Sequence, residues 1–195
     1  MKTKTDSSDE FRTKGMRRLL TVLFACFLLP LAASANEAVQ IPGQWSFEGS
    51  AIDFGDDDIY SNVAGKAVSS GMKDRIDEYL QEAGIHEGSM TFSFNEDYSF
   101  NCTFMGIPLE GTWRTLDGGS RIQLQFGKKM NYLSMTGTVN GTSSQCCMLF
   151  EESRFLTFLR KSLSMAGKRS DVLKSIHYLS GQYNRMQIGC SLEKD

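Results

Sequence analysis

MTFSFNEDYSFNCTF, residues 90–104, is the stretch that decides the fold of this chain. Apolar side chains alternate with polar ones from residue 90 to residue 94, and the alternation returns from residue 100 to residue 104. Between them, Asn95-Glu96-Asp97 supplies turn-forming residues. Period-two alternation around a short turn predicts a β-hairpin with one buried face.

The same alternation recurs through most of the chain. Asn140-Gly141 is a strong signal for a tight turn between two such segments. Strands that follow one another at short spacing favour an antiparallel meander closed into a barrel or sandwich. Besides the hairpin, strands are expected at residues 44–48, 109–114, 121–126, 133–139, 146–150 and 186–192.

Helical periodicity interrupts the strands in two places. From Ser61 to Ala83 apolar residues recur every four positions, although Gly65 and Gly71 weaken this helix and leave open whether it is broken. Residues 152–166 have the same spacing, and a further helix is expected to begin near Asp171. The predicted fold is mostly β: an antiparallel barrel of about eight strands, with one helix inserted early and one or two before the last strand.

Residues 16–35 have the order of a secretory signal. Arg17 and Arg18 precede an uncharged apolar run, Leu19–Leu31, and Ala33-Ser34-Ala35 follows with small residues for cleavage. The run is too short for a stable membrane span, which needs about 20 apolar residues. We therefore expect an exported protein, periplasmic or secreted, with a leader at 1–35 and one domain at 36–195.

Two details of the leader stay open. The polar residues 1–15 do not fit a signal peptide, so translation is expected to start at Met16. Leu23-Phe24-Ala25-Cys26 resembles a lipoprotein box, but Phe24 is bulky and the apolar run continues beyond Cys26. Lipidation at Cys26 is therefore the weaker alternative.

The charge balance and the spacing of possible metal ligands argue against two classes of function, nucleic-acid binding and metal binding. Without the leader, 15 Lys and Arg stand against 20 Asp and Glu, and this acidic balance disfavours binding to nucleic acid. The only histidines, His86 and His177, lie far apart, and Asp56-Asp57-Asp58 lacks the ligand order of a calcium loop. No metal or cofactor is expected.

Four cysteines follow the leader, and an exported protein can form disulfides between them. The strand alternation places three of them on apolar faces and Cys147 on the opposite face. Buried free thiols are favoured over two bridges, which remain the alternative. The four are Cys102, Cys146, Cys147 and Cys190.

Gly43-Gln44-Trp45 resembles the G-x-W of lipocalins. The chain is also similar to a family of exported lipocalin-like domains of unknown function from Gram-negative bacteria, over residues 43–192. The similarity lies in GQWSFEG, AIDF, the early helix, MTFSFNEDYSF, GTWRTL and IGCSL, in that order. It implies a barrel whose end is sealed by Trp45 beneath an arginine, and Arg154 has the matching position. The resulting hypothesis is that the Arg154 guanidinium lies over the Trp45 ring. The alternative is an unpaired arginine in the first turn of a surface helix.

The leading functional hypothesis is non-enzymatic binding of a small apolar ligand inside the barrel. An eight-stranded barrel is wide enough for packed side chains or for one small ligand. The alternative is a packed module that acts through its surface on another envelope protein. No catalytic set is recognised and no protein partner is indicated. The candidate lining residues are Phe47, Phe92, Phe94, Phe104, Trp113 and Phe126.

Overall fold

The structure is a computed structural model that describes residues 39–55, 63–183 and 185–195. Its described part contains every predicted strand and nearly all of the predicted helical residues. The predicted leader at 1–35, with Met16 and Cys26, and the acidic turn Asp56–Asp58 lie outside the described residues.

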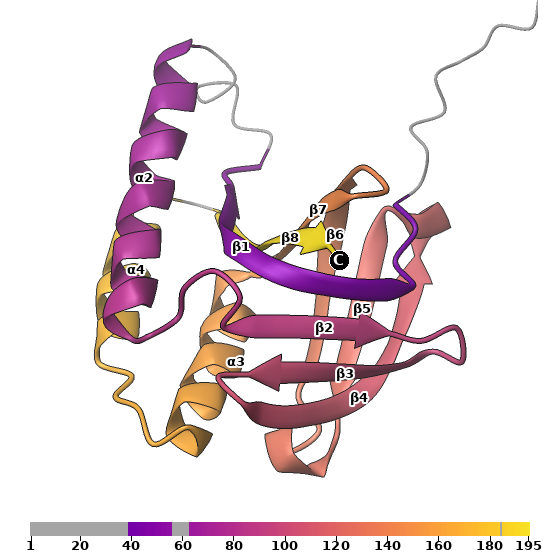
Figure 1. Cartoon of the computed structure of the whole chain (residues 1–195). Coiled ribbons are helices and arrows are strands. Elements are labelled where there is room, and N and C mark those ends of the chain that lie inside the picture. The colour runs from indigo at the N-terminus through magenta and orange to yellow at the C-terminus, as the bar shows by residue number, and fades with distance from the viewer. Residues whose placement is uncertain (1–38, 56–62, 184) are drawn as a thin grey trace, which may run out of the picture. The chain divides into compact units, whose positions relative to one another are not determined.

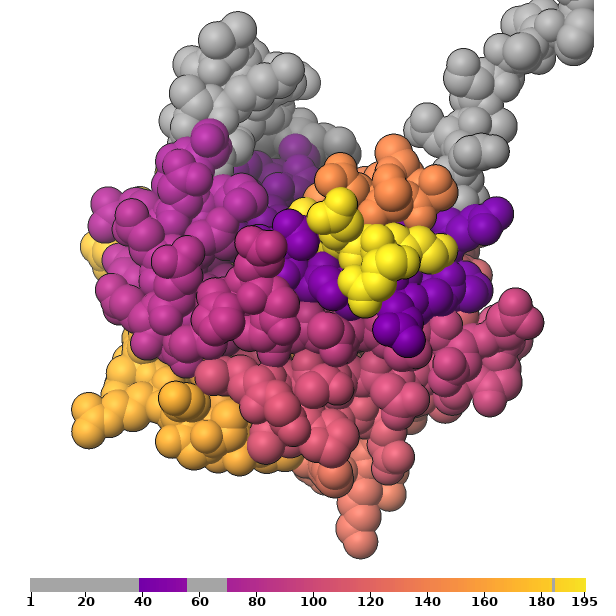
Figure 2. All heavy atoms as spheres, viewed as in Figure 1, coloured from indigo at the N-terminus to yellow at the C-terminus, as the bar shows by residue number. Residues whose placement is uncertain are grey.

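Eight antiparallel strands form a closed barrel, as the sequence predicts (Figure 1). Each strand pairs with the next along the chain, and β1 closes the sheet by pairing with both β2 and β8. Figure 2 shows the indigo atoms of β1 against the yellow atoms of the C-terminal strand at this seam. The strands are β1 (Gly43–Asp53), β2 (Met90–Phe94), β3 (Ser99–Phe104), β4 (Ile107–Leu116), β5 (Arg121–Phe126), β6 (Ser134–Gly141), β7 (Gln145–Glu151) and β8 (Gln187–Lys194).

The hairpin β2–β3 explains why the barrel has an apolar interior. Every second residue of each strand is buried, and the residues between them are partly or fully exposed. Phe92 pairs with Cys102 and Phe94 with Phe100, so apolar side chains face one another across the ladder. The pairing fixes the register, since a slip of one residue would turn the aromatic rings toward solvent.

Three helices of the described part accompany the barrel: α2 (Val63–Glu82), α3 (Glu152–Met165) and α4 (Val172–Ser180). The predicted early helix is one continuous helix through Gly71. α2 lies against β1 and α4, and α3 lies against β7, β8 and α4. None of the helices in the described residues is long and apolar enough to cross a membrane.

The two ends of the barrel differ. At one end, here called the helical end, β1, β3, β5 and β7 finish and α3 begins. Phe158 of α3 lies 5.9 Å from Phe104 and 5.2 Å from Phe126 between ring centroids, and these two rings end β3 and β5. Helix α3 thus fills the helical end with aromatic side chains.

The other end, here called the turn end, carries the β2–β3, β4–β5 and β6–β7 connections and the start of β1. The β4–β5 connection contains a short 3-10 turn, η2 (Asp117–Gly119), and its counterpart at the helical end is η3 (Lys128–Met130) between β5 and β6.

A carboxylate of α2 joins that helix to the barrel. The β1–β8 pairing is irregular between Phe47 and Gly49. Next to this bulge, the Ser50 amide donates to Asp77 Oδ1 at 2.7 Å, and Lys73 Nζ donates to Asp77 Oδ2 at 2.6 Å. Asp77 therefore satisfies a strand amide where the ladder is distorted, which places α2 along the barrel wall.

Candidate functional site

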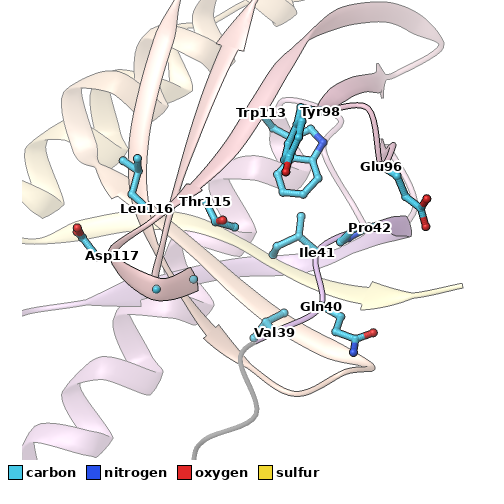
Figure 3. Close-up of a pocket in the computed structure, with 12 residues that line it drawn as sticks. Val39, Gln40, Ile41, Pro42, Glu96, Tyr98, Trp113, Thr115, Leu116 and Asp117 are labelled. Carbon is cyan, nitrogen blue, oxygen red and sulfur yellow. The ribbon is translucent and has the colours of Figure 1, made fainter.

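The turn end of the barrel is hollowed. A hollow of about 760 Å³ lies between the chain before β1, the β2–β3 turn and the β4–β5 turn (Figure 3). Small-molecule sites commonly span about 300–1,000 Å³, so this hollow is the candidate site. It is lined by Val39, Gln40, Ile41, Pro42, Glu96, Tyr98, Trp113, Thr115, Leu116, Asp117, Gly118 and Gly119.

Two aromatic rings form one side of the hollow. Trp113 of β4 is buried, and its Nε1 donates to the Asn95 carbonyl at 3.1 Å. Tyr98 is 59% exposed, and its ring centroid lies 5.6 Å from that of Trp113, tilted by 54°. In Figure 3 both rings face Ile41 across the hollow. Tyr98, Tyr132 and Tyr178 are the large exposed apolar side chains of the described residues, and Tyr98 is the one that lines this hollow.

The backbone around Tyr98 is held in an uncommon conformation. Its φ of 65° lies in the left-handed region, which non-glycine residues rarely adopt. The Tyr98 amide donates to the Asn95 carbonyl at 3.1 Å, and its carbonyl accepts from the Trp113 amide at 2.8 Å. Backbone strain of this kind is often found at binding sites. The two hydrogen bonds fix the backbone of Tyr98.

Asp97 strengthens the same turn. Its Oδ1 accepts from the Ser99 hydroxyl at 2.6 Å and from the Ser99 amide at 2.9 Å. These two hydrogen bonds stabilise the charged form and hold the pKa of the Asp97 carboxyl below its ordinary value. Asn95 Nδ2 donates to the Ser99 hydroxyl at 2.9 Å, which ties the two ends of the turn together.

The segment before β1 forms the opposite side of the hollow. Ile41 is buried, and its carbonyl accepts from Trp45 Nε1 at 2.8 Å. Lys194, near the end of β8, reaches the same segment and donates to the Gln40 carbonyl at 3.4 Å. Residues 40–41 are thus bound to the barrel by a tryptophan and a lysine.

The β4–β5 turn forms the third side of the hollow. Asp117, Gly118 and Gly119 all have positive φ values of 51°, 70° and 98°. Two glycines suit such a turn because they adopt this conformation without steric cost. Asp117 Oδ2 accepts from Arg121 at 3.0 Å, and the Asp117 carbonyl accepts from the Ser120 hydroxyl at 2.9 Å.

The structure buries all six predicted lining rings and packs them into the core. Phe94 lies 5.7 Å from Phe92 and 5.6 Å from Trp113, and the Phe158 ring continues the packing to the helical end. Trp113 alone among the six also lines the hollow. The exposed fractions are small for Phe47, Phe92, Phe94, Phe104, Trp113 and Phe126.

The structure corrects the predicted partner of Trp45. Lys194 Nζ lies 5.2 Å from the centre of the Trp45 ring, because the two residues pair across β1 and β8. Arg154 is exposed and follows Glu151, which pairs with Gln187 at the opposite end of β8. At about 3.3 Å per residue, that end lies roughly 23 Å from Lys194. Lys194 therefore takes the place that the resemblance assigned to Arg154.

Sequence reasoning missed most of the hollow. Tyr98, Ile41 and Asp117 were given no role in a site. A signal was present, since Tyr98 is the one aromatic residue in a run of turn formers and breaks the alternation of the flanking strands. Its exposure could not be predicted from that pattern.

The cysteines lie as the alternation predicts, with Cys102, Cys146 and Cys190 buried, Cys147 half-buried, and all four free. Burial, helped by neighbouring thiols, raises the pKa of Cys146 to about 12 and raises the pKa values of Cys102 and Cys190 well above the ordinary range. The thiolate is the nucleophile and metal ligand. At neutral pH these three residues therefore act as small apolar side chains.

A serine, a histidine and a glutamate meet between α3 and α4. The Ser180 hydroxyl donates to Glu152 Oε1 at 2.8 Å, and His177 Nδ1 lies 2.8 Å from the same oxygen. A serine nucleophile would need its hydroxyl hydrogen-bonded to the imidazole, so this arrangement joins two helices and does not activate the serine. Among the described residues, no group of His, Cys, Asp and Glu side chains is placed to hold a metal ion.

Fold and site together define a closed lipocalin-like barrel with helix α3 filling one end and a hollow at the other. A family model described as lipocalin-like domain (DUF4923) matches residues 31–194, and the chain belongs to this family. The predicted lipocalin-like family is thus confirmed.

Comparisons with individual proteins give no further information on function. No curated protein matches the chain. Among solved structures, a DUF4847 family protein from Bacteroides vulgatus is similar, with 15% identity and a TM-score of 0.32 over 55% of this chain and 82% of that protein.

Proposed function

We propose that this domain is an exported, non-enzymatic binding protein that holds a small, largely apolar molecule in the hollow at the turn end. One observation carries the proposal: Tyr98 is exposed beside Trp113, over a hollow of about 760 Å³, and its backbone is fixed by hydrogen bonds. The proposal moves the ligand from the barrel interior to the barrel end, because the predicted lining rings are packed against one another.

Elementary energetics support an apolar ligand. A ligand ring that covers about 100 Å² of apolar surface on the exposed lining residues, such as Tyr98 and Pro42, would gain roughly 2.5 kcal/mol. Preorganisation of Tyr98 lowers the entropy lost on binding. The remaining lining residues offer backbone and side-chain oxygens for a few polar contacts, which is typical of small-molecule sites.

The packed interior also favours a second candidate, a module that acts through its outer surface on another protein of the cell envelope. Native mass spectrometry of protein from its own host separates the two. A retained small molecule would appear as added mass and support ligand binding, whereas a co-purified protein of defined stoichiometry would support the surface module.

The test of ligand binding compares two tyrosines. Tyr98 and Tyr132 are 59% and 63% exposed, and both have positive φ, at 65° and 53°. Tyr132 follows η3 at the helical end. We expect Tyr98→Ala to weaken binding of the neutral fluorescent probe N-phenyl-1-naphthylamine about tenfold, in line with about 1–1.5 kcal/mol for an aromatic pair. Tyr132→Ala should bind as the unaltered protein does. Absence of binding, or equal loss in both variants, would contradict the proposal.

A further inference from the structure

The charged residues that line the hollow are both acidic. Among its described lining residues, Glu96 and Asp117 are acidic and none is basic. Figure 3 places these two residues at opposite edges of the hollow, with their carboxylate oxygens directed away from the Trp113 and Tyr98 rings. A cleft lined by one sign of charge raises the local concentration of ligands with the opposite charge.

The two cations next to the hollow are already engaged. Arg121 pairs with Asp117 at 3.0 Å. Lys194 lies over the Trp45 ring and donates to the Gln40 carbonyl. Glu96, in contrast, has no ion pair within the described part of the chain. Its negative charge is therefore available to a ligand in the hollow.

The aromatic pair attracts positive charge in the same place. The face of an aromatic ring carries partial negative charge, and an organic cation is attracted to it within about 6 Å of the ring centre. Tyr98 presents an exposed ring, and the buried Trp113 supports it with its ring centre 5.6 Å away. An exposed aromatic ring with a carboxylate nearby is an arrangement that attracts ammonium groups.

We propose that the ligand of this hollow is an organic cation: an apolar, preferably aromatic body that carries an ammonium group. This inference rests on the proposed function and specifies its ligand class. The apolar body lies against the exposed Pro42 and Tyr98, and the ammonium group lies on the Tyr98 ring, where the exposed side chain of Glu96 can turn toward it. An anionic ligand of the same shape is repelled by the unpaired Glu96.

Three indoles of similar shape and different charge test whether the hollow prefers a cation. Tryptamine carries an ammonium group, 3-propylindole is neutral, and indole-3-propionate carries a carboxylate. Calorimetric titration of the intact protein should give tryptamine binding about tenfold tighter than 3-propylindole, as expected for a cation–π contact together with a screened carboxylate. Indole-3-propionate should bind most weakly, and added salt should narrow the differences.

Two glutamate variants test whether Glu96 causes the preference for the cationic ligand. Glu96→Gln should reduce the preference for tryptamine over 3-propylindole. Glu110→Gln is the matched control, because Glu110 is exposed on β4 and lies outside the lining of the hollow. It should retain the full preference.

The outcomes separate this inference from the proposed function. Equal binding of the three indoles, tighter binding of the anion, or no binding of any indole would overturn the cation inference. The proposed function is decided separately by Tyr98-dependent binding of N-phenyl-1-naphthylamine, which is neutral at pH 7. A preference for tryptamine that survives in Glu96→Gln would also overturn the inference, because the carboxylate would then have no part in it.

Discussion

Gly111 of β4 pairs with Phe100 of β3, and the Phe100 ring lies against the strand backbone at this point. A Cβ atom added to Gly111 would lie 2.3 Å from the Gln125 carbonyl oxygen and 2.6 Å from Phe100 Cε1. Both distances are shorter than van der Waals contact. Glycine is thus required here by close packing, although its φ is ordinary.

We expect Gly111→Ala to lower the free energy of unfolding by roughly 1–3 kcal/mol, the usual range for overpacking a core. Gly71→Ala is the control, because Gly71 is exposed in α2 and an added Cβ would meet nothing within 4 Å. That change should stabilise by up to about 1 kcal/mol, since alanine favours the helix. Urea denaturation followed by circular dichroism measures both. Equal stability of Gly111→Ala and the unaltered protein would contradict the packing argument.

Asp97 makes the stability of the β2–β3 turn depend on pH. Because the pKa of Asp97 is lowered in the folded state, its contribution to stability is complete above the unfolded value of about 4. It is lost as the pH falls through the lower folded value. Thermal unfolding between pH 6 and pH 2 should show a smaller loss of stability for Asp97→Asn than for the unaltered protein. If stability falls equally with pH in Asp97→Asn and in the unaltered protein, the Asp97 carboxylate does not stabilise the turn.

At the scale of elements, α3 completes the core that the strands leave open. Its Phe158 lies against Phe104 and Phe126, and Phe155 continues the packing toward Phe150 of β7. The helix therefore stabilises the barrel by filling its end. Its amphipathic spacing was sufficient to predict the helix but not the end of the barrel that it fills.

Removal of the Phe158 ring should destabilise the folded protein. We expect Phe158→Ala to lower the free energy of unfolding by about 3–5 kcal/mol, as for other buried phenylalanines. Tyr178→Ala on α4 is the matched control, because Tyr178 is 73% exposed. It should change stability by less than about 0.5 kcal/mol. A similar small effect in both variants would mean that α3 does not close the core.

The strands and helices could be predicted because each buries a regular face. Period-two alternation located all eight strands to within a few residues, and four-residue spacing located the helices. The early helix was left open as broken because each internal glycine costs about 1 kcal/mol. It is continuous because Met72, Ile76 and Leu80 are buried and compensate for that cost.

At the scale of the whole barrel, the two ends have different roles. The helical end is filled by α3, whereas the turn end carries the hollow, the exposed Tyr98 and the acidic rim. Alternation in a sequence reports which face of a strand a side chain occupies, but not how much of the interior a distant helix fills. For that reason Trp113 was predicted in the candidate site, whereas Tyr98, Ile41 and Glu96 were not.

The two tryptophans allow the most direct test of where ligands bind. Trp113 lines the hollow, whereas Trp45 is fully buried beneath Lys194. Each indole N–H gives its own signal in an ¹H–¹⁵N correlation spectrum. On titration with N-phenyl-1-naphthylamine, we expect the Trp113 signal and the amides of Gln40, Tyr98 and Gly118 to shift in a saturable manner. Shifts confined to the amides of interior residues such as Met148 and Phe126, with the Trp113 signal unchanged, would contradict binding at the turn end.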